Sequence, residues 1–71
     1  MSAAANDSPR RLLRFDEVAS RVGLGRSAIY GRIRAKTFPA PVHLGGYSVA
    51  WVEAEIEEWI AARITERDKA A

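Results

Sequence analysis

The sequence predicts a mainly α-helical fold with one small β-hairpin. Apolar residues recur at helical spacing in three segments, at 16–22, 26–36 and 52–65. A Gly-Leu-Gly sequence separates the first segment from the second, and a Gly-Gly pair separates two short extended runs that precede the third. These signals predict two helices joined by a tight turn, then a hairpin, then a last helix.

The first half of the chain is expected to form a short edge strand and two helices. Leu12 and Leu13 supply the strand, and acidic residues at 16 and 17 favour the start of the first helix, which ends at Val22. Gly23 suits the left-handed position after a helix, so it marks the turn. The second helix runs from 26 to 35 or 36, with Ile29 and Ile33 facing inward.

The second half is expected to form the hairpin and the longest helix. Pro39 and Pro41 force extended backbone before them and end the second helix. Strands at 42–44 and 47–51 then flank a two-residue Gly45-Gly46 loop. The last helix carries an apolar stripe and an opposite acidic face, and Trp51 and Trp59 are expected to close the hairpin onto it. The stripe comprises Val52, Ile56, Trp59, Ile60 and Ile64.

A single domain accounts for most of the chain. The 71 residues have room for one domain, which we place at 11–65 between tails at 1–10 and 66–71 that we expect to be disordered. No apolar run in the first nine residues is suited to a signal peptide, and none elsewhere is long enough to cross a membrane, so we expect a cytoplasmic protein.

The order of these elements is that of a winged helix-turn-helix, and the charges are distributed to match it. Residues 10–38 carry a net charge of +6, whereas residues 39–71 carry −3. A basic half of this kind favours a polyanion such as double-stranded DNA. In this architecture the second helix enters the major groove and the hairpin reaches the backbone or the minor groove.

The predicted DNA-binding residues therefore lie on the second helix and at the tip of the hairpin. Arginine pairs well with guanine, serine contacts bases or phosphates, and a glycine within the helix costs about 1 kcal/mol of helix propensity, which a close approach to DNA would explain. The residues are Arg26, Ser27, Tyr30, Gly31, Arg32, Arg34, Lys36, Gly45, Gly46 and Tyr47.

Several of these residues have a purely structural alternative. Tyr30 also fits a position in the core, and Gly45-Gly46 is fully explained as a turn. His43 is expected to face solvent, since no other ligand stands at metal-binding spacing. The sequence contains no phosphate-binding glycine loop and no set of nucleophile, base and orienting residue. We therefore expect no catalytic residue, no metal and no cofactor, and we do not expect an enzyme.

The run from Arg11 to Arg63 resembles the AlpA-type prophage regulators, which are small relatives of the MerR-like and excisionase winged helices. The resemblance rests on short motifs at the family's distances, namely Leu12-Leu13-Arg14, Gly23 to Tyr30, Thr37-Phe38-Pro39, Leu44-Gly45-Gly46, Val49-Ala50-Trp51 and Glu58-Trp59-Ile60. It implies a transcription regulator or a recombination directionality factor of a prophage or integrative element. It also implies DNA contacts at Arg26, Ser27, Tyr30 and the wing around Gly46.

The chain departs from this family at four positions. The family commonly has Ser or Thr at position 25, a basic or bulky residue at 31, and Arg at 47 and 52, where this sequence has Gly25, Gly31, Tyr47 and Val52. Glycine at position 25 weakens the cap of the second helix. A wing without these arginines is expected to make fewer charge contacts with DNA.

Duplex DNA is therefore the expected partner, bound by a homodimer or by several copies on adjacent sites. An alternative is a protein-interaction adaptor that uses the acidic helix around Trp59 to bind an integrase or RNA polymerase. Binding to RNA or single strands would require more exposed aromatic residues than Tyr30 and Tyr47.

Overall fold

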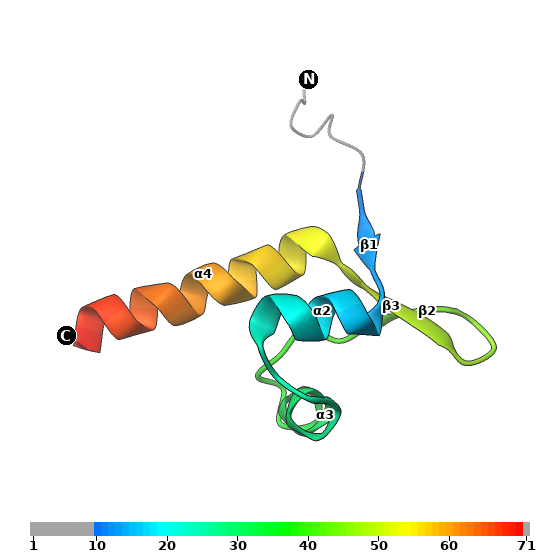
Figure 1. The fold of residues 1–71 in the computed structure, drawn as a ribbon, viewed down its shortest axis with the longest axis horizontal. Helices are drawn as coiled ribbons and strands as arrows, with labels where there is room; N and C mark the ends of the chain where they lie inside the picture. The colour runs from blue at the N-terminus through cyan, green and yellow to red at the C-terminus, as the bar shows by residue number, and fades with distance from the viewer. Residues whose placement is uncertain (1–9, 71) are drawn as a thin grey trace.

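The computed structural model describes residues 10–70, so the predicted tail at 1–10 lies outside it except for Arg10. Its elements are β1 (Leu12–Leu13), α2 (Phe15–Val22), α3 (Arg26–Arg34), β2 (Val42–Gly45), β3 (Ser48–Val52) and α4 (Glu53–Ala70). In Figure 1, α3 lies below α2 and α4 passes above it, while the β2–β3 hairpin extends away from the helices. The prediction of a mainly helical chain with a small β region is confirmed. No helix within residues 10–70 has the length and apolar character needed to span a membrane.

The turn between α2 and α3 forms as its glycines predict. Gly23 adopts a left-handed conformation, with φ of 72°, and its N–H donates to the carbonyl of Ala19 at 2.8 Å. That conformation carries no steric cost for glycine, so the chain turns from α2 into α3 within three residues. The result is a helix-turn-helix in which Val18 of α2 and Ile29 of α3 are both fully buried.

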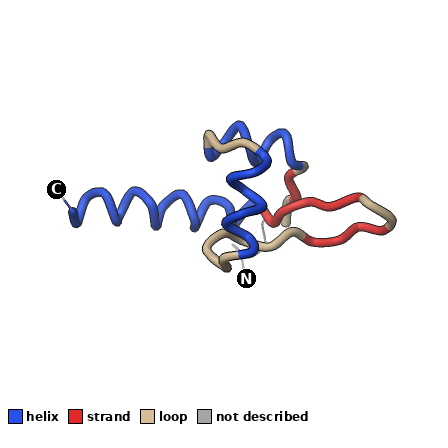
Figure 2. The backbone as a smooth tube through the Cα atoms, turned by 90° about the horizontal axis from the view of Figure 1, so that it is seen from below, coloured by secondary structure: helices blue, strands red, loops and turns tan. Residues whose placement is uncertain are grey.

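The three strands form one antiparallel sheet in the order β1-β3-β2. Leu13 pairs with Trp51 at one edge, and Val42 pairs with Ala50 at the other. Figure 2 shows the hairpin of β2 and β3 extending from the helices as a wing. Every residue of β2 is exposed, so main-chain pairing to β3 holds this strand and the core does not.

The hairpin turn differs from the predicted one by a single position. Gly45 belongs to β2 and pairs with Ser48 beside a bulge, so the two residues of the turn are Gly46 and Tyr47. Gly45 and Gly46 both have positive φ, at 121° and 55°. The bulge uses the conformational freedom of Gly45 and moves the turn towards Tyr47.

The core takes side chains from every element except β2. Its members are Leu13, Val18, Ile29, Phe38, Ala50, Trp51 and Ile56. Trp51 is completely buried, and its indole N–H donates to the carbonyl of Pro39 at 3.0 Å. Trp59 was expected to close the hairpin onto the last helix. It instead fastens α4 to the loop after α3, because its indole N–H donates to the carbonyl of Thr37 at 2.8 Å and its ring packs edge-on against Phe38.

The last helix is longer than predicted and begins one residue later. Val52 ends β3, and α4 continues to Ala70 where a tail was expected from residue 66. Alanine, glutamate, arginine and lysine are all good helix formers, so the helix persists without packing partners. An ion pair between Arg63 and Glu66 at 2.9 Å adds support one turn apart. Figure 1 shows this end of α4 extending beyond the rest of the fold.

A cluster of charges joins α4 to the first half of the domain. Arg21 of α2 lies 3.0 Å from Glu17, 3.0 Å from Glu53 and 2.7 Å from Glu57. Arg11 lies 3.7 Å from Glu17 and 3.5 Å from Glu53. Several charges that share partners stabilise more than an isolated surface pair. The cluster thus places the N-terminal turn of α4 against α2.

Replacement of the buried core residue of α4 should destabilise the domain. We expect Ile56→Ala to lower the free energy of unfolding by about 2–5 kcal/mol, because it removes buried contacts and leaves a cavity. The matched control is Ile64→Ala, since Ile64 is 46% exposed. Urea unfolding followed by tryptophan fluorescence measures both variants. Equal losses would contradict the assignment of Ile56 as the anchor of α4.

Candidate nucleic-acid interface

Helix α3 presents most of the predicted DNA-binding residues to solvent. Arg26, Ser27, Arg32 and Arg34 are exposed, whereas Ile29 on the opposite side is completely buried. The helix thus has one face fixed in the core and another free for a partner. Its N-cap, Gly25, makes no side-chain capping hydrogen bond, as its residue type predicts.

Arg26 is held in place by an aromatic ring. Its guanidinium carbon lies 4.1 Å from the centroid of Phe15 and 6.0 Å from that of Tyr30. Cation–π contact of this kind orients the side chain while leaving its hydrogen-bond donors free. Phe15 belongs to α2, so the first helix positions a basic side chain of the second.

Tyr30 is half-buried, which favours the structural alternative for its ring. The ring stacks on Phe15 with centroids 6.3 Å apart and meets Trp51 edge-on at 6.3 Å. The body of the side chain therefore belongs to the aromatic cluster behind α3. The sequence left this choice open because the position lies at the border between the inward and outward faces of the helix.

Gly31 has no crowding around it within the domain. A Cβ at this position would meet only the guanidinium of Arg34, at 3.9 Å. Packing therefore does not require glycine here, and the position has normal helical φ. The prediction that a partner's close approach explains Gly31 remains compatible with this geometry.

Lys36 follows α3 and its cap residue Ala35 in a conformation that is normally reserved for glycine. Its φ is 64°, and among the described residues it is the only non-glycine with positive φ. Its N–H donates to the carbonyl of Ile33 at 3.0 Å, and the N–H of Thr37 donates to that of Arg32 at 2.9 Å. This is a Schellman motif with lysine in the left-handed position. The prolines that predict the helix end, Pro39 and Pro41, lie further on, so no residue type at 35–37 signals this motif.

The tip of the wing projects fully into solvent. Tyr47 is 103% exposed, and Gly45 and Gly46 are exposed beside it. No core contact explains an aromatic ring in this place. His43 on β2 is also exposed, as predicted.

Not every basic residue of the first half is available to a partner. Arg11 and Arg21 are engaged by carboxylates of α2 and α4. The pKa of Arg21 is raised above its ordinary value, because burial acts to lower it but hydrogen bonds to Glu17 and Glu53 and their negative charges outweigh that effect. Within residues 10–70, no ion pair engages the remaining basic residues of this half, which are Arg10, Arg14, Arg26, Arg32, Arg34 and Lys36.

A groove of about 430 Å³ lies between the start of α2, the start of α3 and the wing. Its lining residues include Arg14, directly before α2, Arg26, the first residue of α3, and Tyr47, at the tip of the wing. The groove therefore brings together residues from three segments of the chain. Arg14 is not among the predicted DNA-binding residues. Its position directly before the first helix is the one feature of the sequence that could have indicated a DNA contact here. The wing lies near Arg14 only because of the tertiary fold.

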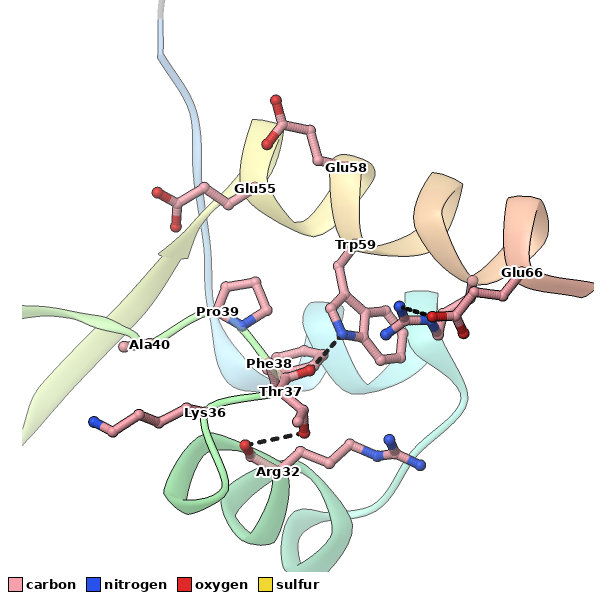
Figure 3. Close-up of a pocket in the computed structure, with 11 residues that line it drawn as sticks. Arg32, Lys36, Thr37, Phe38, Pro39, Ala40, Glu55, Glu58, Trp59 and Glu66 are labelled. Atoms are coloured by element: carbon pink, nitrogen blue, oxygen red, sulfur yellow. Dashed lines mark hydrogen bonds and ion pairs between the residues drawn. The ribbon is translucent and has the colours of Figure 1, made fainter.

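A larger groove, of about 970 Å³, separates the end of α3 from α4. Figure 3 shows Trp59 inside it, with Arg32 and Lys36 on the α3 side and Glu55 and Glu58 on α4. The guanidinium of Arg63 covers Trp59, with its central carbon 4.9 Å from the ring centroid. We call this feature the α3–α4 groove. The part of the chain described by the structure holds no group of three or more residues suited to a metal ion.

A protein family and a curated relative that match this chain both carry the name AlpA. The family described as "Prophage CP4-57 regulatory protein (AlpA)" matches residues 11–64. An uncharacterised protein, ORF88, of Enterobacteria phage P4 is 48% identical over 59 residues, which cover 83% of this chain and 67% of the relative. The DNA-binding transcriptional activator AlpA of Escherichia coli K12 is 41% identical over 64 residues, which cover 82% of this chain and 91% of the relative. No solved structure matches the chain.

Replacement of Lys36 by glycine should stabilise the isolated domain. We expect Lys36→Gly to raise the free energy of unfolding by about 1 kcal/mol, because the left-handed conformation is unfavourable for any residue with a Cβ. Lys36→Ala is the matched control, since it removes the same side chain but keeps the strain. Urea unfolding compares the two variants, and a gain in the alanine variant equal to that in the glycine variant would contradict this explanation.

Proposed function

Because the chain belongs to the AlpA family of prophage regulatory proteins, we propose that it is a transcription regulator that binds double-stranded DNA with a sequence preference. A regulatory family also agrees with the expectation that the chain is not an enzyme. We place its action in the bacterial cytoplasm, where such DNA is accessible. The relative from E. coli, named as a DNA-binding transcriptional activator, supports this proposal.

The observation that carries the proposal is the free face of α3 next to the wing. One side of α3 is anchored by Ile29, and the other exposes arginines that have no ion-pair partner among residues 10–70. Arg26 of α3 and Tyr47 of the wing line the same small groove, so both elements lie on one side of the domain. A helix and a wing arranged in this way suit the major groove and the adjacent backbone, respectively.

We assign different roles to the residues along α3. Arg26 and Ser27, at its start, are the proposed base-reading residues, and Arg32, Arg34 and Lys36 are proposed to contact phosphates. Contacts to phosphate fix the position of a protein on DNA, whereas contacts to base edges select the sequence. Tyr30 contributes through its hydroxyl group at most, because its ring packs in the aromatic cluster. Gly31 allows the helix to approach closely, and Gly45, Gly46 and Tyr47 form the wing contact.

A narrower role follows from the resemblance to excisionases. We propose that the protein acts near the integrase gene or attachment site of a mobile element, as a regulator or as a directionality factor. A domain of this size covers little DNA, so we propose that it binds as a dimer or as several copies on adjacent sites. Stoichiometry on a DNA fragment with several sites would separate these arrangements.

Loss of the α3 arginines should abolish specific DNA binding. We expect the double variant Arg26→Ala, Arg34→Ala to reduce affinity for a fragment from the protein's own genomic neighbourhood by at least about 30-fold, since two arginines that each supply about 1–3 kcal/mol contribute at least about 2 kcal/mol together. Fluorescence anisotropy measures the dissociation constant across a salt series, beside a random duplex of equal length. The matched control is Arg63→Ala, Arg67→Ala, which removes the same charge from α4.

The salt series distinguishes specific binding, non-specific binding and no binding. A steep salt dependence with tighter binding of the native fragment supports specific recognition. Equal affinity for both duplexes would reduce the function to non-specific binding. No binding by the wild-type protein at low salt would overturn the proposal.

The α3–α4 groove favours a second candidate function, that of a protein-interaction adaptor. It combines a half-buried tryptophan with acidic residues that form no ion pair among the described residues, Glu55 and Glu58. A basic segment of an integrase or of RNA polymerase would complement the acidic α4 side of this groove, whose α3 side carries Arg32 and Lys36. The wing lies near the start of α3 and this groove at its end, so the two functions overlap only at Arg32 and Lys36, which line the groove and are also proposed phosphate contacts.

Neutralising the groove should separate partner binding from DNA binding. We expect Glu55→Gln, Glu58→Gln to weaken binding of the purified integrase of the same mobile element by about tenfold, because two charges facing a basic partner are lost. DNA affinity should change by less than about threefold, and calorimetry and anisotropy measure the two affinities. Unchanged integrase binding in this variant, or its absence in the wild-type protein, would exclude the adaptor function for this partner.

A further inference from the structure

The small groove between α2, α3 and the wing contains two charged residues, Arg14 and Asp16, to which the proposed DNA contacts give no role. Its floor is made by half-buried side chains, Phe15, Tyr30 and Val49. Above them stand two exposed guanidinium groups, those of Arg14 and Arg26, and the exposed phenol of Tyr47. The groove thus combines an apolar floor with several hydrogen-bond donors around a shallow space.

Both arginines in this groove are free to bind an anion. The structure gives neither of them an ion pair or a side-chain hydrogen bond within residues 10–70. Arg26 is fixed over the ring of Phe15, 4.1 Å from its centroid, so its position is set before any ligand binds. One carboxylate, that of Asp16, also lines the groove and reduces its positive charge.

We propose that this groove binds a phosphodiester group of the DNA backbone and that Arg14 is its principal phosphate ligand. This inference rests on the proposed function. A guanidinium offers paired donors that match the oxygens of a phosphate group, and the hydroxyl of Tyr47 adds a donor from the wing. Since α3 and the wing flank the groove, the backbone of a DNA strand that contacts both elements passes over Arg14.

The assignment gives Arg14 and Asp16 opposite roles. Arg14 attracts the phosphate, and Asp16 repels it at short range, so the affinity for DNA reflects their balance. This balance is independent of base sequence, because neither side chain is on the helix proposed to read bases. Arg14 therefore sets the register of the protein on the DNA, while α3 selects the site.

The test uses the full chain with single substitutions on both sides of this balance. We expect Arg14→Gln to weaken binding about fivefold, equally for the native fragment and for random duplex, and to reduce the slope of log affinity against log salt by about 1. Asp16→Asn should strengthen binding about two- to threefold on both duplexes, because it removes a repulsive charge. Fluorescence anisotropy across a potassium chloride series measures all variants, and thermal melting verifies that each is folded.

Arg67→Gln is the matched control, because it removes one arginine charge at the exposed end of α4. If Arg14→Gln behaves like this control while the wild-type protein binds DNA, the phosphate site is overturned and the proposed function stands. If Arg14→Gln weakens only the native fragment, Arg14 contacts a base and the phosphate assignment is again overturned. If the wild-type protein binds neither duplex at low salt, the proposed function itself fails, and the phosphate site fails with it.

Discussion

The burial of Trp51 holds the helix-turn-helix and the hairpin of this small domain together. Its side chain is completely buried, its backbone pairs with Leu13, and its indole N–H donates to the carbonyl of Pro39. Its ring also packs against Phe15 and Tyr30. One residue thereby connects β1, α2, α3 and the loop that leads to the wing. In a chain too short for a large core, such a connection fixes the helix-turn-helix relative to the hairpin.

The same aromatic cluster links packing to the proposed function. The half-buried rings of Phe15 and Tyr30 pack against Trp51 and against each other. The ring of Phe15 also contacts the guanidinium of Arg26 at the surface. On the other side of α2, Glu53 and Glu57 of α4 engage Arg21. The acidic helix therefore neutralises part of the basic half and leaves the positive charge concentrated on α3 and near the wing. The net charge of +2 gives no indication of this division.

The predicted and observed positions of the proposed DNA-binding residues agree where a position depends only on its own helix or turn. Arg26, Arg34 and Tyr47 are exposed as expected, because helical spacing and a glycine turn are local properties. Lys36 is predicted to flank the exposed face at the end of the second helix, but its left-handed backbone is not predicted, since a lysine gives no signal for it. Arg14 was missed because its relation to the wing depends on contacts between distant segments.

The amino-acid sequence predicts the order of the elements, the helix-turn-helix and the hairpin, because each follows from periodicity, glycine and proline within a few residues, and the segregation of charge is read directly from composition. Tertiary packing sets which side of Tyr30 is buried, which arginines α4 neutralises, and that Trp59 fastens α4 to the loop after α3 rather than to the hairpin. It also extended α4 to Ala70. These outcomes depend on how side chains from separate segments compete for the same neighbours, which local sequence preferences do not specify.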